Sequence, residues 1–202
     1  MKRVTGPRAG TILEHTSVRN RQTATIELAK AAMFTSAAVG AGFALAYVPN
    51  IELITAIVFA AGVYLGLSWG SVVGAVSMLI FSGVNPMGSG FINPPLVIAQ
   101  VISMVLIATT GGLLRSWIFS AKWTKPKIVM LCLTGGLLTF IYDSLTTLST
   151  PFAIGFESEN LLAFYLAGIG FTFLHQLSNM AVFALVLPGL FSRIRQPSGK
   201  GS

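Results

Sequence analysis

Two polar side chains that could do chemistry, Asp143 and His175, lie in otherwise apolar stretches of this chain. A carboxylate beside an imidazole can pass a proton, and the same pair can hold a small ligand through hydrogen bonds. Asn179 lies four residues after His175, so a helix would place both on one face. The other histidine, His15, lies near the N-terminus, so we expect no zinc site and no other metal or cofactor.

Further hydrogen-bonding and aromatic side chains lie at the predicted turns and helix ends. Asn-Pro pairs commonly begin turns, so ordinary loop chemistry would explain any one of them. Together they place uncharged polar groups and rings at one end of the molecule, which suits a small neutral or zwitterionic ligand. The expected substrate-binding residues are Asn50, Glu52, Asn85, Phe91, Asn93, Gln100, Tyr142, Asp143, His175 and Asn179.

The elements that position these groups must lie in a membrane. Hydrophobic residues make up 53% of the 202 residues, and charged residues only 9%, against about 25% in soluble domains. The segment from Leu53 to Leu114 contains no charged residue. A soluble fold this apolar would have no surface to present to water, so we expect lipid-facing helices in one domain.

Six apolar segments are candidate membrane spans, each near the roughly 20 residues that a bilayer requires or somewhat shorter. They are Ala31–Val48, Ile51–Leu67, Gly70–Val84, Pro95–Leu114, Ile128–Leu148 and one crossing within Leu161–Phe191. Gly168-Ile-Gly170 would break the last of these and leave its first part at the outer mouth.

The basic residues indicate the orientation. With three crossings between Glu52 and Arg115, all thirteen lysines and arginines can lie on one side, which the positive-inside rule makes the cytoplasm. The sequence therefore predicts an all-α integral membrane protein of the plasma membrane, a six-helix bundle with both termini cytoplasmic. Residues 1–26 would be a disordered basic tail, 27–195 the membrane domain and 196–202 a short tail. The net charge of +7 then favours contact with the bilayer and not with nucleic acid.

The first predicted helix carries small residues at a four-residue spacing, Ala32, Ser36 and Gly40. Such rows let helix backbones approach closely in lipid. Packing within the bundle and docking of a separate membrane subunit both explain the row.

Motifs of energy coupling and catalysis are missing from the sequence. It contains no P-loop, no nucleophile elbow and no His-Glu-x-x-His. We therefore expect no enzyme. A membrane enzyme using Asp143 and His175 as an acid–base pair is one alternative, although the two are predicted at different depths. A ligand-free assembly subunit is another.

Several segments resemble the substrate-binding S components of energy-coupling factor (ECF) transporters. They are Tyr47-Val-Pro-Asn-Ile-Glu-Leu-Ile54, Phe59-Ala-Ala-Gly-Val-Tyr-Leu-Gly66, Gly74-Ala-Val-Ser77, Asn85-Pro, Pro94-Pro-Leu-Val-Ile-Ala-Gln100, Gly111-Gly-Leu-Leu114, Tyr142-Asp-Ser-Leu-Thr146 and His175-Gln-Leu-Ser-Asn179. The resemblance covers roughly residues 28–192 and rests on the order of these segments.

The resemblance implies a binding subunit that holds a vitamin or related micronutrient in an outward-facing pocket. Such subunits join a transmembrane T component and two cytoplasmic ATPases, which drive release inside the cell. The family docks through an alanine-x-x-x-alanine pattern on its first helix, which maps onto Ala32 and Ser36, with Gly40 continuing the row. Ser36 departs from that pattern. Because the predicted outer end lacks lysine and arginine, free vitamins and precursors are expected in preference to phosphorylated forms.

Overall fold

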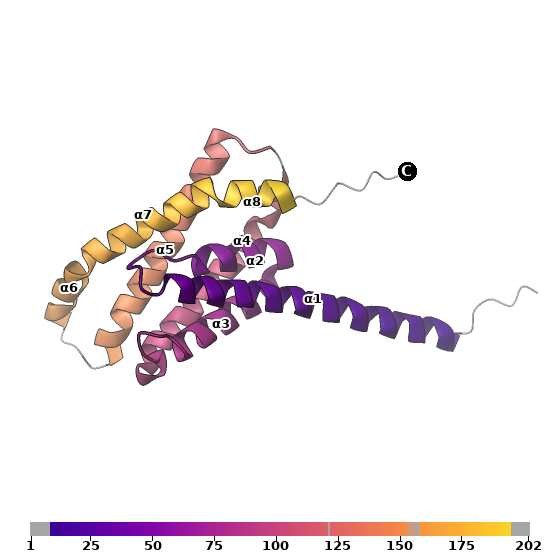
Figure 1. Cartoon of the computed structure of the whole chain (residues 1–202), viewed down its shortest axis with the longest axis horizontal. Helices are drawn as coiled ribbons and strands as arrows, with labels where there is room; N and C mark the ends of the chain where they lie inside the picture. The colour runs from indigo at the N-terminus through magenta and orange to yellow at the C-terminus, as the bar shows by residue number, and fades with distance from the viewer. Residues whose placement is uncertain (1–8, 121, 154, 156–157, 195–202) are drawn as a thin grey trace, which may run out of the picture.

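Helices make up every regular element of the part that the structure describes, residues 9–120, 122–153, 155 and 158–194 of a computed structural model. They are α1 (Ala9–Leu45), α2 (Ile54–Leu65), α3 (Leu67–Gly83), the short 3₁₀ helix η1 (Gly90–Ile92), α4 (Pro94–Ser120), α5 (Lys125–Ala153), α6 (Ser158–Ala167), α7 (Ile169–Leu185) and α8 (Leu187–Ile194) (Figure 1). The predicted all-α class is thus confirmed. The expected tail at 196–202, with position 195 before it, lies outside the described residues.

Four stretches are long and apolar enough to cross a membrane: Arg21–Leu45, Pro94–Ser120, Lys125–Ser149 and Ile169–Arg193. The apolar helices α2 and α3 are shorter, at 12 and 17 residues. Many large apolar side chains of the described part face outward, among them Leu113, Leu137 and Phe171. This surface is compatible with a membrane protein, because lipid can cover it.

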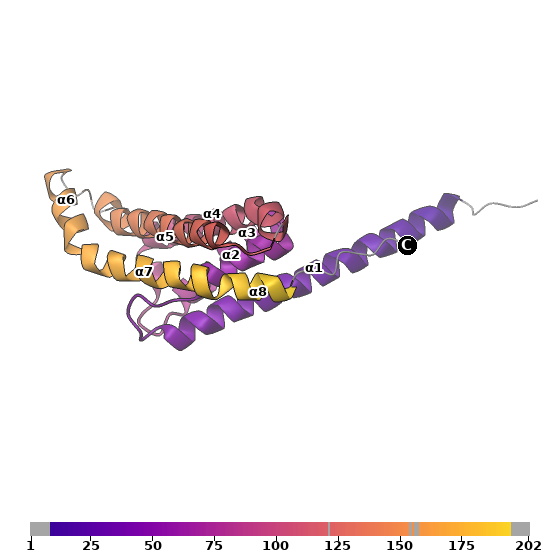
Figure 2. The same cartoon turned by 90° about the horizontal axis from the view of Figure 1, so that it is seen from above.

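The first helix begins well before the predicted first span. It runs unbroken from Ala9 to Leu45, so residues 9–26 of the expected tail are helical. Residues 1–8 of that tail are not among those described. In Figures 1 and 2 the N-terminal part of α1 extends beyond the other helices. The C-terminal part of α1 packs against α2 and α3.

The helix α4 is central to the packing. It packs against α2 and α3, which precede it in the sequence, and against α5, which follows it. The helix α5 in turn packs along α7. Figure 2 shows α5 and α7 running side by side. The contact between α2 and α7 is smaller. Consequently residues from α2, α5 and α7 meet where these pairs converge.

Glycines allow α4 to lie very close to α2. A β-carbon on Gly62 of α2 would collide with the carbonyl oxygen of Ala108, and one on Gly111 of α4 would collide with that of Phe59. Because both obstacles are backbone atoms, neither can move aside as a side chain could. These glycines therefore set the separation of the two helices.

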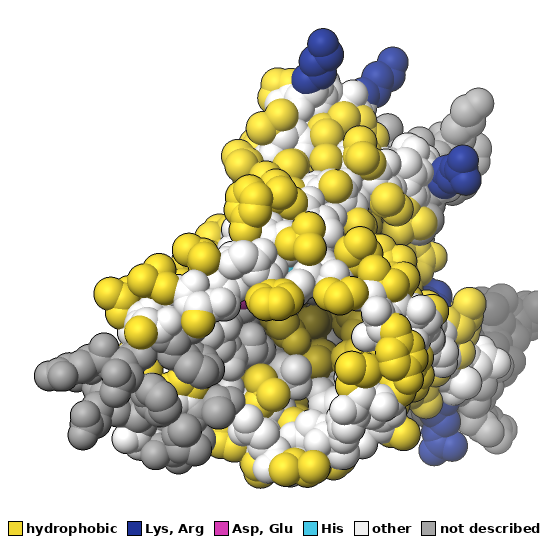
Figure 3. Space-filling view, turned by 60° about the vertical axis from the view of Figure 1, so that its left-hand side comes forward, with side chains coloured by type: hydrophobic (Ala, Val, Ile, Leu, Met, Phe, Trp, Pro, Cys, Tyr) yellow, Lys and Arg dark blue, Asp and Glu magenta, His cyan; other side chains and the backbone are white. Residues whose placement is uncertain are grey.

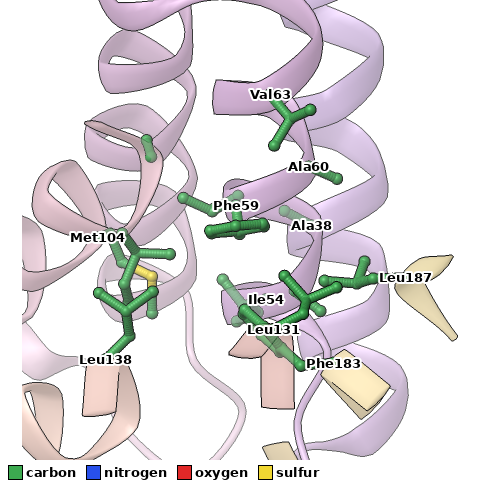
Figure 4. Close-up of a cluster of buried hydrophobic side chains, with 14 of the residues drawn as sticks. Ala38, Ile54, Phe59, Ala60, Val63, Met104, Leu131, Leu138, Phe183 and Leu187 are labelled. Atoms are coloured by element: carbon green, nitrogen blue, oxygen red, sulfur yellow. The ribbon is translucent and has the colours of Figure 1, made fainter. Parts of the chain in front are cut away.

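The buried core brings α2, from the N-terminal half of the chain, into contact with α7 and α8 from the C-terminal end. Figure 4 shows Phe59 among apolar side chains of several helices. Its ring lies 5.0 Å from that of Phe183 and 6.5 Å from that of Phe191, measured between centroids. The α2 helix is buried along most of its length, with ten of its twelve residues inside. It is a central helix and not a lipid-facing one.

The predicted break in the last apolar segment is confirmed. The helix α6 ends at Ala167, and α7 begins at Ile169 after Gly168. A second interruption at Val186 separates α7 from α8. As a result, His175 lies only about two turns from the beginning of α7, near the same end of the bundle as the loop that precedes α2.

Candidate functional site

The loop between α1 and α2 carries the first residues of the site. Asn50 adopts a left-handed backbone conformation, with φ of 58°, which asparagine tolerates better than most residues. Its carbonyl oxygen accepts a hydrogen bond of 2.8 Å from the hydroxyl of Ser178 on α7. The loop is thereby fastened to α7, although the two residues are far apart in sequence.

Glu52 is held at the N-terminus of α2. Its Oε2 atom accepts a hydrogen bond of 2.9 Å from the backbone N–H of Thr55, in the first turn of the helix. A carboxylate is favoured there by the helix dipole and the free N–H groups. The hydrogen bond from Thr55 and the helix dipole both favour the charged form of this side chain.

His175 lies between two carboxylates. Its Nδ1 atom is 2.7 Å from Oδ1 of Asp143 on α5, and its Nε2 atom is 3.5 Å from Oε1 of Glu52. Asp143 and His175, which were predicted at different depths, are therefore in direct contact, because α5 and α7 pack along each other.

Asn179 and Tyr142 complete the cluster. The side-chain amide of Asn179 donates a 3.2 Å hydrogen bond to Oε1 of Glu52. The ring of Tyr142 meets the imidazole of His175 edge-on, with centroids 5.9 Å apart. Asp143 and His175 are each 8% exposed and Asn179 is fully buried. These five residues are called the polar cluster below: Glu52, Tyr142, Asp143, His175 and Asn179.

Hydrogen-bonding capacity remains in the polar cluster. Buried atoms without a hydrogen-bond partner include Oδ2 of Asp143, Nε2 of His175 and Oδ1 of Asn179. Buried polar atoms are normally satisfied, so such a group calls for an explanation. Of the three residues, His175 lines a cavity in which a ligand or water would complete its hydrogen bonding, whereas Asp143 and Asn179 lie behind the cavity wall.

A cavity of about 190 Å³ adjoins the polar cluster. Its polar wall contains Glu52, Tyr142 and His175, and its apolar wall includes Met78, Phe81 and Met104. It is smaller than the roughly 300–1,000 Å³ typical of drug-sized ligand sites, so it suits a compact ligand. Figure 3 shows a hollow in one face of the molecule, rimmed mainly by apolar side chains, with the lysines and arginines visible on that face lying away from it.

Six of the ten predicted site residues do not line the cavity. Asp143 and Asn179 belong to the polar cluster, and Gln100 contacts it. The other three, Asn85, Phe91 and Asn93, make local contacts. Asn85 accepts a hydrogen bond from the backbone N–H of Met87, and Asn93 accepts one from that of Leu96 in the first turn of α4. Phe91 is largely exposed, with its ring against Gly83. These contacts are the ordinary turn chemistry that Asn-Pro sequences favour.

Gln100 does not line the cavity but contacts a residue that does. Its side-chain carbonyl accepts a 2.8 Å hydrogen bond from the hydroxyl of Ser82 on α3, and its side chain interacts with that of Tyr142. Gln100 thus supports the polar cluster from behind the cavity wall.

A second hollow lies between α4 and α5. It measures about 670 Å³ and is lined by Pro95, Ile98, Ala99, Ile102, Leu145, Leu148 and Ser149. None of these side chains is ionisable. A lipid chain could occupy this hollow. The hollow lacks the polar groups that would select one polar ligand.

Sequence reasoning missed the apolar wall and the supporting hydroxyls. Met78, Phe81 and Met104 lie in apolar helices, where nothing distinguishes them from packing residues. Ser82 and Ser178 are single hydroxyl side chains, and nothing in their sequence context indicates a role in a site. Their partners, Gln100 and the Asn50 carbonyl, are known only from the folded chain.

No metal centre is formed by the part of the chain that the structure describes. It contains no group of three or more His, Cys, Asp or Glu side chains arranged to hold a metal ion. No protein-family model, curated protein or solved structure matches this chain. The fold and the site of the described residues define an all-helical protein with four candidate membrane helices and a compact cavity, whose polar wall contains Glu52, Tyr142 and His175.

Proposed function

We propose that this protein is the membrane-embedded, substrate-binding subunit of an ECF-type importer for a vitamin or related micronutrient. The polar cluster beside the cavity is the observation that carries the proposal. Unpartnered buried acceptors and donors next to an apolar wall are what a small ligand with one polar side requires. The sequence resemblance to S components supports the same assignment.

The proposed topology has six crossings with both termini in the cytoplasm of a prokaryotic cell. At 1.5 Å per residue, α2 and α3 are roughly 18 and 26 Å long, against a hydrocarbon core of about 30 Å. The buried position of α2 favours a crossing that other helices shield and loop residues extend. The cavity then opens to the outside, and Lys122 and Arg115 lie on the cytoplasmic side.

The proposed docking face for the T component is on α1. Ala32, Ser36 and Gly40 are exposed, and a β-carbon on Gly40 would meet nothing within 4 Å. The opposite face of the helix, with Ala31 and Ala38, is the one buried against the bundle. Packing within the bundle therefore does not account for the exposed row. Its availability supports docking of a T component, with two ATPases completing the transporter.

The acid–base alternative gains one observation from the structure, the 2.7 Å contact between Asp143 and His175. However, Nε2 of His175 lies 3.5 Å from Oε1 of Glu52, so a second carboxylate competes with any substrate for that nitrogen. Binding without chemical change is therefore the better proposal. Under the enzyme alternative, Asp143→Asn would abolish turnover of a substrate that the variant still binds.

Mass spectrometry of the purified protein tests the proposed function. Protein isolated gently in detergent should release a stoichiometric, chemically unmodified micronutrient when it is denatured. If nothing is released, and no vitamin or precursor in a broad panel raises the melting temperature, the proposed function is wrong. A released compound that is chemically altered on incubation would favour the enzyme.

A further inference from the structure

We infer that the ligand of this cavity carries a positive charge, as a protonated amine or a cationic heteroaromatic ring, placed against Glu52. The inference rests on the proposed function and narrows its substrate class. Its starting point is the charge of the cavity wall. The wall and the residues behind it supply two carboxylates, from Glu52 and Asp143, and one imidazole.

The formal charges around the cavity favour a cation. The acid Glu52 lines the cavity, whereas Asp143 contacts His175 from behind the wall. No lysine or arginine lines the described cavity. The described lysines with known partners are engaged elsewhere, since Lys30 pairs with Glu27 and Lys127 binds the Ile118 carbonyl. An uncompensated charge in a poorly solvated site is costly, and a ligand with one positive charge would neutralise it.

The remaining wall suits the same class of ligand. Phe81 and Tyr142 place two aromatic rings on the cavity surface, and cations are attracted to ring faces. The sulfur atoms of Met78 and Met104 offer polarisable contacts to an aromatic ligand body. Glu52 is half-buried and forms part of the wall, so one carboxylate remains within reach of the ligand. An anionic ligand would meet the Glu52 carboxylate and, among the described residues of the wall, no lysine or arginine.

Binding measurements with compounds of matched shape and different charge test this inference. Suitable probes for the full-length protein in detergent are pyridoxamine against pyridoxine, thiamine as a permanent cation, and pantothenate and biotin as anions. A cationic compound should bind best, and the micronutrient that co-purifies should carry a positive charge at neutral pH. Glu52→Gln should weaken binding of that cation about tenfold to a hundredfold.

Glu27→Gln is the matched control, because Glu27 lies on α1 beside Lys30 and away from the cavity; it should leave affinity unchanged. The inference is overturned if a neutral or anionic compound co-purifies or binds best, if Glu52→Gln binds the cation normally, or if sodium ions alone raise the melting temperature. A neutral or anionic micronutrient that is bound and imported would leave the proposed function standing. If nothing co-purifies and nothing binds, both fail.

Discussion

At the scale of single residues, His175 is the centre of the site. It contacts Asp143 directly and faces Glu52, while Tyr142 packs against its ring. A buried carboxylate needs a hydrogen-bonded partner, since removing one side of a buried ion pair leaves the other uncompensated. His175 therefore both stabilises Asp143 and shapes the cavity wall.

Replacing His175 with alanine should destabilise the protein by roughly 3–5 kcal/mol, because the buried Asp143 carboxylate would lose its partner. The double variant His175→Ala, Asp143→Ala should lose less than the sum of the two single variants, since it leaves no buried charge unpaired. Thermal unfolding of the four proteins in one detergent measures this coupling. Additive losses would show that the two side chains do not interact.

The members of the polar cluster could be predicted from the sequence, but their arrangement could not. Asp143, His175 and Asn179 are conspicuous as polar groups in apolar segments, and Glu52 as an isolated acid. Their contacts join positions as far apart as Glu52 and Asn179, which depends on how α2, α5 and α7 converge. Helix depth, estimated from apolar runs alone, gave no indication that Asp143 and His175 are in direct contact.

At the scale of elements, close approach of α2 and α4 underlies the site, because α2 carries the Glu52 loop at its N-terminus. Gly111→Ala should destabilise the protein by a few kcal/mol, since the added β-carbon collides with the Phe59 carbonyl oxygen. Gly40→Ala is the control within another helix, where a β-carbon meets nothing within 4 Å. It should be neutral or slightly stabilising. Equal melting temperatures for the two variants would mean that α2 and α4 are not packed as described.

Element boundaries show where sequence patterns are strong and where they are weak. The break at Gly168 was predictable, because two glycines interrupt an overlong apolar segment. The start of α1 at Ala9 was not, since a polar, basic segment has no apolar periodicity to indicate a helix. The shortness of α2 was also hidden, because apolar loop residues such as Ile51 and Leu53 extend the hydrophobic run without being helical.

At the scale of the whole molecule, the proposed topology places the two ends of the bundle on opposite sides of a membrane. In a Cys132→Ser background, Ser89→Cys should react with a membrane-impermeant maleimide in intact cells, because Ser89 is exposed at the proposed outer end. Lys122→Cys, exposed at the opposite end, should react only after permeabilisation. The reverse pattern would contradict the proposed orientation. Labelling of both cysteines in intact cells would show that the chain does not cross the membrane an odd number of times between the two positions.

The proposed transport function requires an exposed docking face as well as a ligand site. Gly40→Trp should abolish uptake, because the bulky ring would hold the T component away from α1, while ligand affinity stays unchanged. Gly40→Ala, which keeps the face small, should transport normally. Radiolabelled uptake in cells, paired with binding to purified protein, separates the two effects. Loss of binding in the tryptophan variant would instead show that this face packs within the protein.

An experimental structure of the protein with its co-purified ligand tests the central claim most directly. The account predicts a compact ligand in the cavity between Phe81, Met104 and the polar cluster, with a polar atom within hydrogen-bonding distance of Glu52 or His175. An empty cavity in protein that retains stoichiometric ligand, or a ligand bound only in the apolar hollow between α4 and α5, would contradict it.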